Sequence, residues 1–168
     1  MDISIIYYSR TGNTAKMAEL IAQGCESVPG AAGVRVKAMS VEDVDMAFLQ
    51  GSSAVIFGSP THGANLSWQM KRFLEELDQD LLAGKLGAVF ASQNWPGGGG
   101  ASFAEMSIIS SLLVRGMLIY SGGLSVGEPP LHFGAVSHRA PEDELSISRC
   151  IKLGQNIANK ASELFGVN

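Results

Sequence analysis

The sequence has few of the residues that build metal sites, disulfide scaffolds or membrane spans. It contains two cysteines and three histidines in 168 residues, and neither type occurs at a metal-ligand spacing such as CxxC or HxxxH. No apolar run reaches the roughly 18 residues that indicate a membrane span, and no basic region precedes the first apolar run. We therefore expect a cytoplasmic protein with reduced, structural cysteines, no protein-bound metal ion and no membrane partner.

Charged residues are also sparse. They make up 17% of the chain, and the net charge of −4 provides no basic surface for nucleic acid, which we exclude as a partner. Apolar residues make up 46%, and 168 residues is the length of one ordinary domain with a sizeable core. We predict a single domain that spans residues 1–168.

Five apolar runs alternate with helical patterns along the chain. The continuous runs are typical of buried parallel strands, whereas residues 34–39 alternate in polarity as an edge strand does. This alternation predicts an α/β fold with a five-stranded parallel sheet in the order 2-1-3-4-5 and helices on both faces. We expect residues 27–33 and 122–140 to be loops. The expected strands are residues 3–8, 34–39, 53–58, 86–91 and 117–120. The expected helices are residues 15–25, 41–49, 66–77 and 102–115, and a last helix begins at residue 141. The apolar face of this last helix, which extends to Phe165, is expected to lie on the sheet.

The turn after the first expected strand is rich in hydroxyl groups. Ser9, Thr11 and Thr14 can each donate a hydrogen bond to a phosphate oxygen, and Gly12 lets the backbone close around an anion. Arg10 supplies the only formal positive charge in this loop. Because the turn leads directly into a helix, the free N–H groups and the dipole at the helix N-terminus favour the same anion. Ordinary helix capping explains such a turn equally well.

This first loop lacks the Gly-Lys-Ser/Thr ending of a P-loop and the three spaced glycines of a dinucleotide-binding turn, which favours a monophosphate. Two further loops follow the third and fourth expected strands and are rich in Gly, Ser, Asn and aromatic residues: the second loop is residues 59–65, and the third is residues 92–100. Ligands of open α/β sheets bind at the carboxyl ends of the strands, beside the point where the strand order reverses. We therefore expect the three loops to meet around one ligand whose phosphate lies on the first.

These residues resemble a known family. Ser9 and residues 11–14 fill every fixed position of S/T-x-T-G-N-T, the FMN phosphate loop of flavodoxins. More narrowly, residues 58–74 resemble the matching segment of WrbA-like NAD(P)H:quinone oxidoreductases, residues 92–100 resemble their glycine-rich loop, and residues 141–149 resemble the start of their last helix. The resemblance covers nearly the whole chain and implies a flavodoxin-like fold.

The resemblance implies that FMN is the cofactor and that NADH or NADPH is the co-substrate. The phosphate would lie on the first loop, and the isoalloxazine ring would lie between the second and third loops, whose backbone N–H groups would contact its polar edge. The implied FMN contacts are Ser9, Arg10, Thr11, Gly12, Asn13, Thr14, Pro60, Thr61, His62, Gly63, Ser92, Gln93, Asn94, Trp95, Pro96 and Gly97.

The chain also departs from the WrbA-like pattern. Those enzymes carry Arg-Phe where this chain has His62 and Gly63, a histidine where it has Val114, and an insertion after the second strand that this chain lacks. His62 is the expected catalytic residue, because histidine gains and loses a proton near neutral pH; an exposed loop histidine is the alternative. We expect Trp95 to contact the flavin or to pack as a lid, and Trp68 to lie at an interface or on the surface.

Two functions follow from the resemblance. The first is an FMN-dependent oxidoreductase that passes two electrons from NAD(P)H to a quinone or similar small acceptor, since Gly63 and residues 97–100 would leave one face of the flavin open. The second is a flavodoxin-type electron carrier without its own small-molecule substrate, although such carriers are typically strongly acidic and this chain is not. A regulatory role leaves no trace in the sequence. The resemblance also implies a homodimer or homotetramer.

Overall fold

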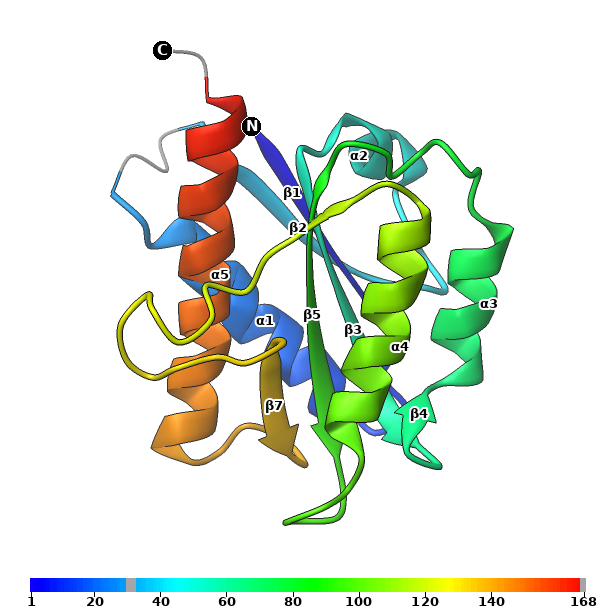
Figure 1. Cartoon of the computed structure of the whole chain (residues 1–168), viewed down its shortest axis with the longest axis vertical. Helices are drawn as coiled ribbons and strands as arrows, with labels where there is room; N and C mark the ends of the chain where they lie inside the picture. Colours follow the sequence, from blue (N-terminus) through cyan, green and yellow to red (C-terminus); the bar gives the residue numbers. More distant parts are fainter. Residues whose placement is uncertain (30–32, 167–168) are drawn as a thin grey trace.

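Alternating strands and helices build a sheet with helices on both of its faces (Figure 1). The computed structural model describes residues 1–29 and 33–166, so the expected loop at 27–33 falls partly outside the described residues. In chain order the elements are β1 (Asp2–Tyr7), α1 (Asn13–Glu26), β2 (Arg35–Ser40), α2 (Met46–Gly51), β3 (Ala54–His62), β4 (Asn65–Leu66), α3 (Trp68–Glu76), β5 (Leu86–Gln93), α4 (Ala101–Val114), β6 (Leu118–Ile119), β7 (Ala135–His138) and α5 (Glu144–Phe165).

The sheet has the order β2-β1-β3-β5-β6, with β7 paired to β5 and the short β4 paired to β3. Neighbouring strands run parallel, except that β4 runs antiparallel to β3. This arrangement confirms the predicted order 2-1-3-4-5, with β5 as the fourth predicted strand. The order reverses between β1 and β3, which places the expected ligand site at the carboxyl ends of these strands.

The last strand differs from the prediction, because it is divided into two pieces. β6 pairs with Leu86 and Gly87 at the start of β5, whereas β7 pairs with residues 90–93 at its end. β7 lies within residues 122–140, which we expected to form a loop. Glycines and prolines surround this strand of only four residues, so it offers no clear apolar run. The expected helix at 41–49 begins only at Met46, after the N-cap Asp45.

Two cores lie on opposite faces of the sheet. α1 and α5 cover one face, and α2, α3 and α4 cover the other (Figure 1). Val55 and Phe57 of β3 are fully buried in the core under α3 and α4, while Ile56 between them is fully buried in the core under α1 and α5. Burial on both faces explains why the central strands are continuous apolar runs in the sequence.

α1 and α5 cross in very close contact at two glycines. A Cβ added to Gly24 would lie 2.2 Å from the carbonyl oxygen of Ile151, and one added to Gly154 would lie 2.1 Å from that of Ile21. The expected stripe of α5 is wrong at its end, since Phe165 is 37% exposed. Cys150, Leu153 and Ile157 of α5 are instead fully buried.

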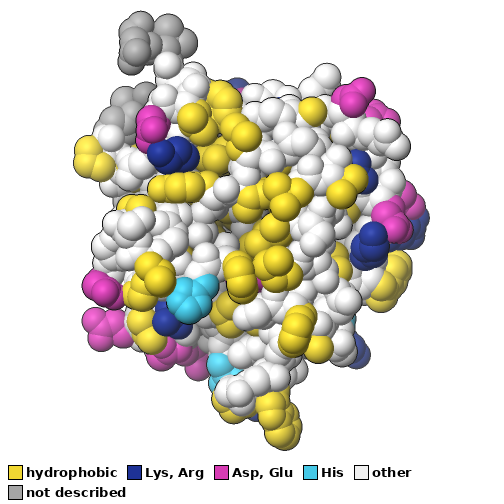
Figure 2. All heavy atoms as spheres, viewed as in Figure 1, with side chains coloured by type: hydrophobic (Ala, Val, Ile, Leu, Met, Phe, Trp, Pro, Cys, Tyr) yellow, Lys and Arg dark blue, Asp and Glu magenta, His cyan; other side chains and the backbone are white. Residues whose placement is uncertain are grey.

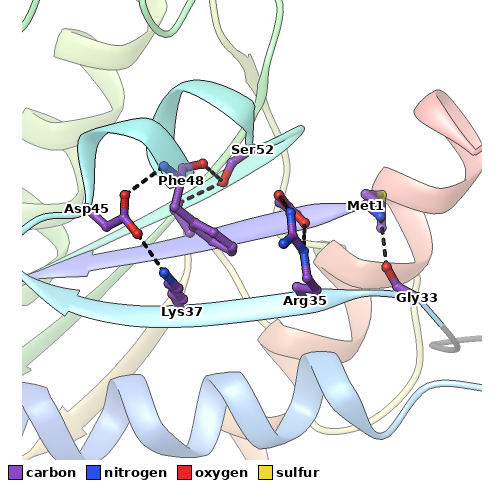
Figure 3. Close-up of polar contacts among 9 residues, drawn as sticks. Met1, Gly33, Arg35, Lys37, Asp45, Phe48 and Ser52 are labelled. Carbon is purple, nitrogen blue, oxygen red and sulfur yellow. Dashed lines mark hydrogen bonds and ion pairs between the residues drawn. The ribbon is translucent and has the colours of Figure 1, made fainter.

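Charged side chains protect the edge strand β2 (Figure 3). The Nε of Arg35 donates to Oδ1 of Asp2 at 2.8 Å, and Nζ of Lys37 donates to Oδ2 of Asp45 at 2.6 Å. The ammonium group of Lys37 also lies 4.7 Å from the ring centroid of Phe48. Exposed pairs of this kind add little to stability, so their main effect is to keep other strands from pairing with this edge.

Candidate functional site

A cleft of about 360 Å³ opens where the loop after β1 meets the carboxyl ends of β3 and β5, which form the start of the second and third predicted loops. This is the edge of the sheet at which the strand arrows end in Figure 1. Every lining residue is among the predicted contacts, and the predicted residues outside the lining are Gly12, Gly63, Trp95, Pro96 and Gly97. The cleft is lined by Ser9, Arg10, Thr11, Asn13, Thr14, Pro60, Thr61, His62, Ser92, Gln93 and Asn94.

The first loop is shaped for an anion at the start of α1. Gly12 is the N-cap residue with a left-handed φ of 90°, and no side chain caps the helix at that position. The Oγ of Ser9 accepts a hydrogen bond of 3.1 Å from the N–H of Ala15. The N–H groups of Asn13 and Thr14 lie too near the helix N-terminus to have partners one turn earlier within the helix. Ordinary helix capping therefore explains the hydroxyl group of Ser9 but not the other hydroxyl groups of this loop.

A buried hydrogen bond joins the first loop to the third. The hydroxyl oxygens of Thr14 and Ser92 lie 2.8 Å apart, and both residues are almost completely buried. The side-chain Oε1 of Gln93 accepts from the N–H of Ala101 at 3.1 Å, so the third loop is also attached to the start of α4. These bonds position the loop before a ligand binds.

Two residues at the carboxyl end of β7, His138 within the strand and Arg139 just after it, contribute to the site although sequence reasoning did not find them. The ring Nε2 of His138 lies 2.9 Å from the carbonyl oxygen of Asn94, and the N–H of Arg139 donates to the carbonyl oxygen of Gln93 at 2.8 Å. They hold the backbone of the third loop. No motif marks His138, and its role depends on the pairing of β7 with β5, which the sequence did not reveal.

The second loop is a tight hairpin between β3 and β4. His62 pairs with Asn65, and the two residues between them have φ values of 55° and 58°, as a two-residue hairpin turn requires. At its base, Oγ of Ser59 accepts from the N–H of Ser67 at 2.8 Å. Thr61 Oγ1 is buried and has no hydrogen-bond partner in the described part of the chain. Thr61 lines the cleft, so this unpartnered hydroxyl lies in its wall.

The arrangement fits FMN. Hydroxyl groups, Arg10 and the start of α1 surround one end of the cleft and suit a phosphate, while the free hydroxyl of Thr61 suits the polar edge of a ring. The volume lies within the roughly 300–1,000 Å³ that is usual for ligand pockets. Two wider but shallower hollows, near Arg115 and near Pro129, contain no residue of the three loops.

Both tryptophans are exposed. Trp68 is 64% exposed at the start of α3, which agrees with the expected surface position. Trp95 is 74% exposed and does not line the cleft, so it does not pack as a lid on the protein. Its contact with the flavin stays a prediction.

The cysteines have no part in the site. Cys25 and Cys150 are free and buried, as predicted, and burial raises the pKa of both thiols to about 12. Across residues 1–29 and 33–166, no three His, Cys, Asp or Glu side chains are grouped as a metal site would require. Among the helices of the described chain, none is both long and apolar enough to cross a bilayer.

The family model described as Flavodoxin matches residues 5–109, and the chain belongs to the flavodoxin family. A protein of Clostridium saccharobutylicum named flavodoxin is 42% identical over 166 residues, which cover 98% of this chain and 100% of that protein. An NAD(P)H dehydrogenase (quinone) of Archaeoglobus fulgidus is 33% identical over 196 residues, which cover 96% of this chain and 98% of that protein.

Solved structures give the same family. An archaeal flavodoxin matches with a TM-score of 0.73 and 30% identity, and the match covers 96% of this chain and 99% of that one. A WrbA-like protein from Agrobacterium tumefaciens matches with a TM-score of 0.76 over 96% and 98% of the chains, and at 19% identity it supports the fold alone. The resemblance to flavodoxins and to NAD(P)H:quinone oxidoreductases is thus confirmed, and membership of the flavodoxin family supports FMN as the cofactor.

Proposed function

We propose that the protein binds FMN in this cleft and passes two electrons from NADH or NADPH to a quinone or similar small acceptor. The observation that carries the proposal is the charge of the site. Residues 8–14, 58–67 and 92–101 contain no Asp or Glu, whereas Arg10 and His62 line the cleft. The three loops themselves therefore present no negative charge to an anionic dinucleotide, and they offer no acidic surface for docking onto basic partners.

The residues of the first loop would hold the cofactor. The hydroxyl groups of Ser9, Thr11 and Thr14 would donate to the phosphate oxygens, and Arg10 would neutralise part of the phosphate charge. FMN, when bound, supplies the capacity to accept and donate a hydride. The protein contributes binding and orientation, and it needs no nucleophile of its own.

The second loop would serve the ring and the acceptor. Thr61 Oγ1 would gain the hydrogen-bond partner that it lacks in the described chain. Gly63 has no side chain to cover the ring, which leaves space for a nicotinamide and then an acceptor to stack in turn. His62, exposed at the rim of the cleft, would donate a proton to an oxygen of the acceptor as it is reduced.

An electron carrier is the second candidate, and the 42% identity to a protein named flavodoxin favours it. A rapid-mixing experiment separates the two. The FMN-loaded protein is mixed without oxygen with NADH or NADPH, and benzoquinone is then added. The enzyme loses its yellow absorbance with one of the nicotinamides and regains it with the quinone. If neither nicotinamide bleaches the flavin while dithionite does, the carrier function is correct.

Oligomerisation forms a further part of the proposal. α4 presents an apolar face to solvent on which Phe103 is 67%, Met106 41%, Leu113 56% and Val114 89% exposed. Figure 2 shows apolar side chains gathered over this side of the molecule. This face would form the contact in the homodimer or homotetramer. The mass in solution, measured by light scattering, tests the assembly, and Val114→Glu should lower that mass if α4 is the interface.

A further inference from the structure

A second cavity, of about 160 Å³, lies between α4, α5 and the segment that leads into β7. It shares no residue with the cleft at the loops, and it is not part of the proposed redox function. Its polar lining comes from Glu105 and Ser102 of α4, Arg149 of α5 and His132, while Phe133 and Val136 provide apolar walls.

Glu105 is the unusual residue of this cavity. It is only 2% exposed, and its Oε1 has no hydrogen-bond partner in the described residues. A Cβ added to Gly134 would lie 2.8 Å from this oxygen, so the glycine leaves space beside the carboxyl group. Burial raises the pKa of Glu105 to about 8, and at neutral pH the side chain is therefore a neutral acid with an O–H to donate. A buried carboxyl group without a partner, on the wall of a cavity, is suited to a ligand that supplies one.

The other titratable groups of the cavity are donors when protonated. Arg149 reaches the cavity from α5 and forms no ion pair among residues 1–29 and 33–166, and His132 reaches it from the chain before β7. β7 contributes only the apolar Val136. With Glu105 neutral, the lining carries positive charge and hydrogen-bond donors, which favours an anion over an ammonium group.

We propose that this cavity binds a small aromatic carboxylate, whose carboxylate group accepts a hydrogen bond from Glu105 and pairs with Arg149. The ring of the ligand packs against Phe133 and Val136. The size agrees, since an apolar cavity of about 150 Å³ holds one benzene ring. Benzoate is the simplest member of this class of ligand.

The test is a titration of the 168-residue chain with benzoate at pH 6 to 10, followed by amide chemical shifts and calorimetry. The protein is first saturated with FMN, so that benzoate cannot occupy the cleft. We expect saturable binding with shifts confined to residues around the cavity. The affinity should fall about tenfold per pH unit above pH 8, because binding needs the proton on Glu105.

Three variants at the cavity and one control variant on α3 assign the interaction. Arg149→Gln should weaken binding at least tenfold, whereas Arg72→Gln on the exposed side of α3 should leave it unchanged. Glu105→Gln keeps an N–H donor and should bind benzoate at pH 7 while losing the pH dependence above 8. His132→Gln should keep that dependence, which separates His132 from Glu105.

The proposal is wrong if millimolar benzoate produces no saturable shifts around the cavity. It is also wrong if benzylamine binds there instead, with an affinity that rises with pH, since this would identify a cation site at an ionised Glu105. Should Glu105→Gln fail to fold, the pH profile of the parent chain and the Arg149→Gln variant still decide the outcome.

Discussion

Replacement of Glu105 by leucine should stabilise the protein at neutral pH. The carboxyl group has an ordinary pKa of 4.5 and a pKa of about 8 in the folded state. At pH 7 the unfolded chain is ionised at this position, so folding must take up a proton. At about 1.4 kcal/mol per pH unit, this uptake costs about 3 kcal/mol, which leucine avoids while filling a similar volume.

The effect has a defined direction with pH. Below pH 4.5 both states hold the proton, and the parent chain has no penalty from proton uptake. Between pH 4.5 and about 8 the folded state keeps the proton and the unfolded state loses it, so stability falls as pH rises. Above pH 8 both states are ionised, and the full loss of about 5 kcal/mol remains.

Urea unfolding at pH 5, 7 and 9, followed by far-ultraviolet circular dichroism, measures this difference. The free energy of unfolding of Glu105→Leu minus that of the parent should be below about 1 kcal/mol at pH 5, about 3 at pH 7 and about 5 at pH 9. The exposed Glu142, replaced by leucine, is the control and should show no such trend. A difference that stays constant with pH would refute the reasoning, because it would mean that Glu105 ionises normally in the folded protein.

Two further predictions concern the cofactor site and the helix crossing. Thr14→Asp should abolish FMN retention, because it places a carboxylate beside the phosphate, whereas Thr14→Ser should keep it. The amount of flavin bound per chain after gel filtration measures the retention. Equal flavin in both variants would remove the assignment of the loop. Gly154→Ala should lower the free energy of unfolding by about 1–3 kcal/mol, because its Cβ would lie 2.1 Å from the carbonyl oxygen of Ile21. Gly98→Ala, where a Cβ meets nothing within 4 Å, should not, and similar losses in both variants would contradict the close crossing.

The parts of the fold that the sequence predicted correctly are those with strong local signals. Continuous apolar runs identified the central strands, and the hydroxyl-rich turn identified the loop at Ser9. The loops meet at one edge because parallel strands end there, and this follows from the predicted strand order alone. The bond between Thr14 and Ser92 joins residues 78 positions apart, and no local pattern contains it.

The parts that the sequence did not predict depend on long-range contacts. Glu105 is a single acid on a helix with apolar residues on most of its sides, and such an acid is expected to face solvent. It is buried because β7 and Gly134 lie against the start of α4. Prediction of the contacts of the third loop and of the second cavity would therefore have required the position of β7.

β7 contributes residues to the surroundings of both sites. Ala135 belongs to the core under α1 and α5, whereas Val136 packs with alanines under α4 and lines the second cavity. Two residues further along, His138 holds the backbone of Asn94 in the third loop. A change at Glu105 that moved β7 would therefore disturb the cleft as well. Flavin content measured on the Glu105 variants separates such movement from a local effect, since a change confined to the cavity leaves the contact between His138 and Asn94 in place.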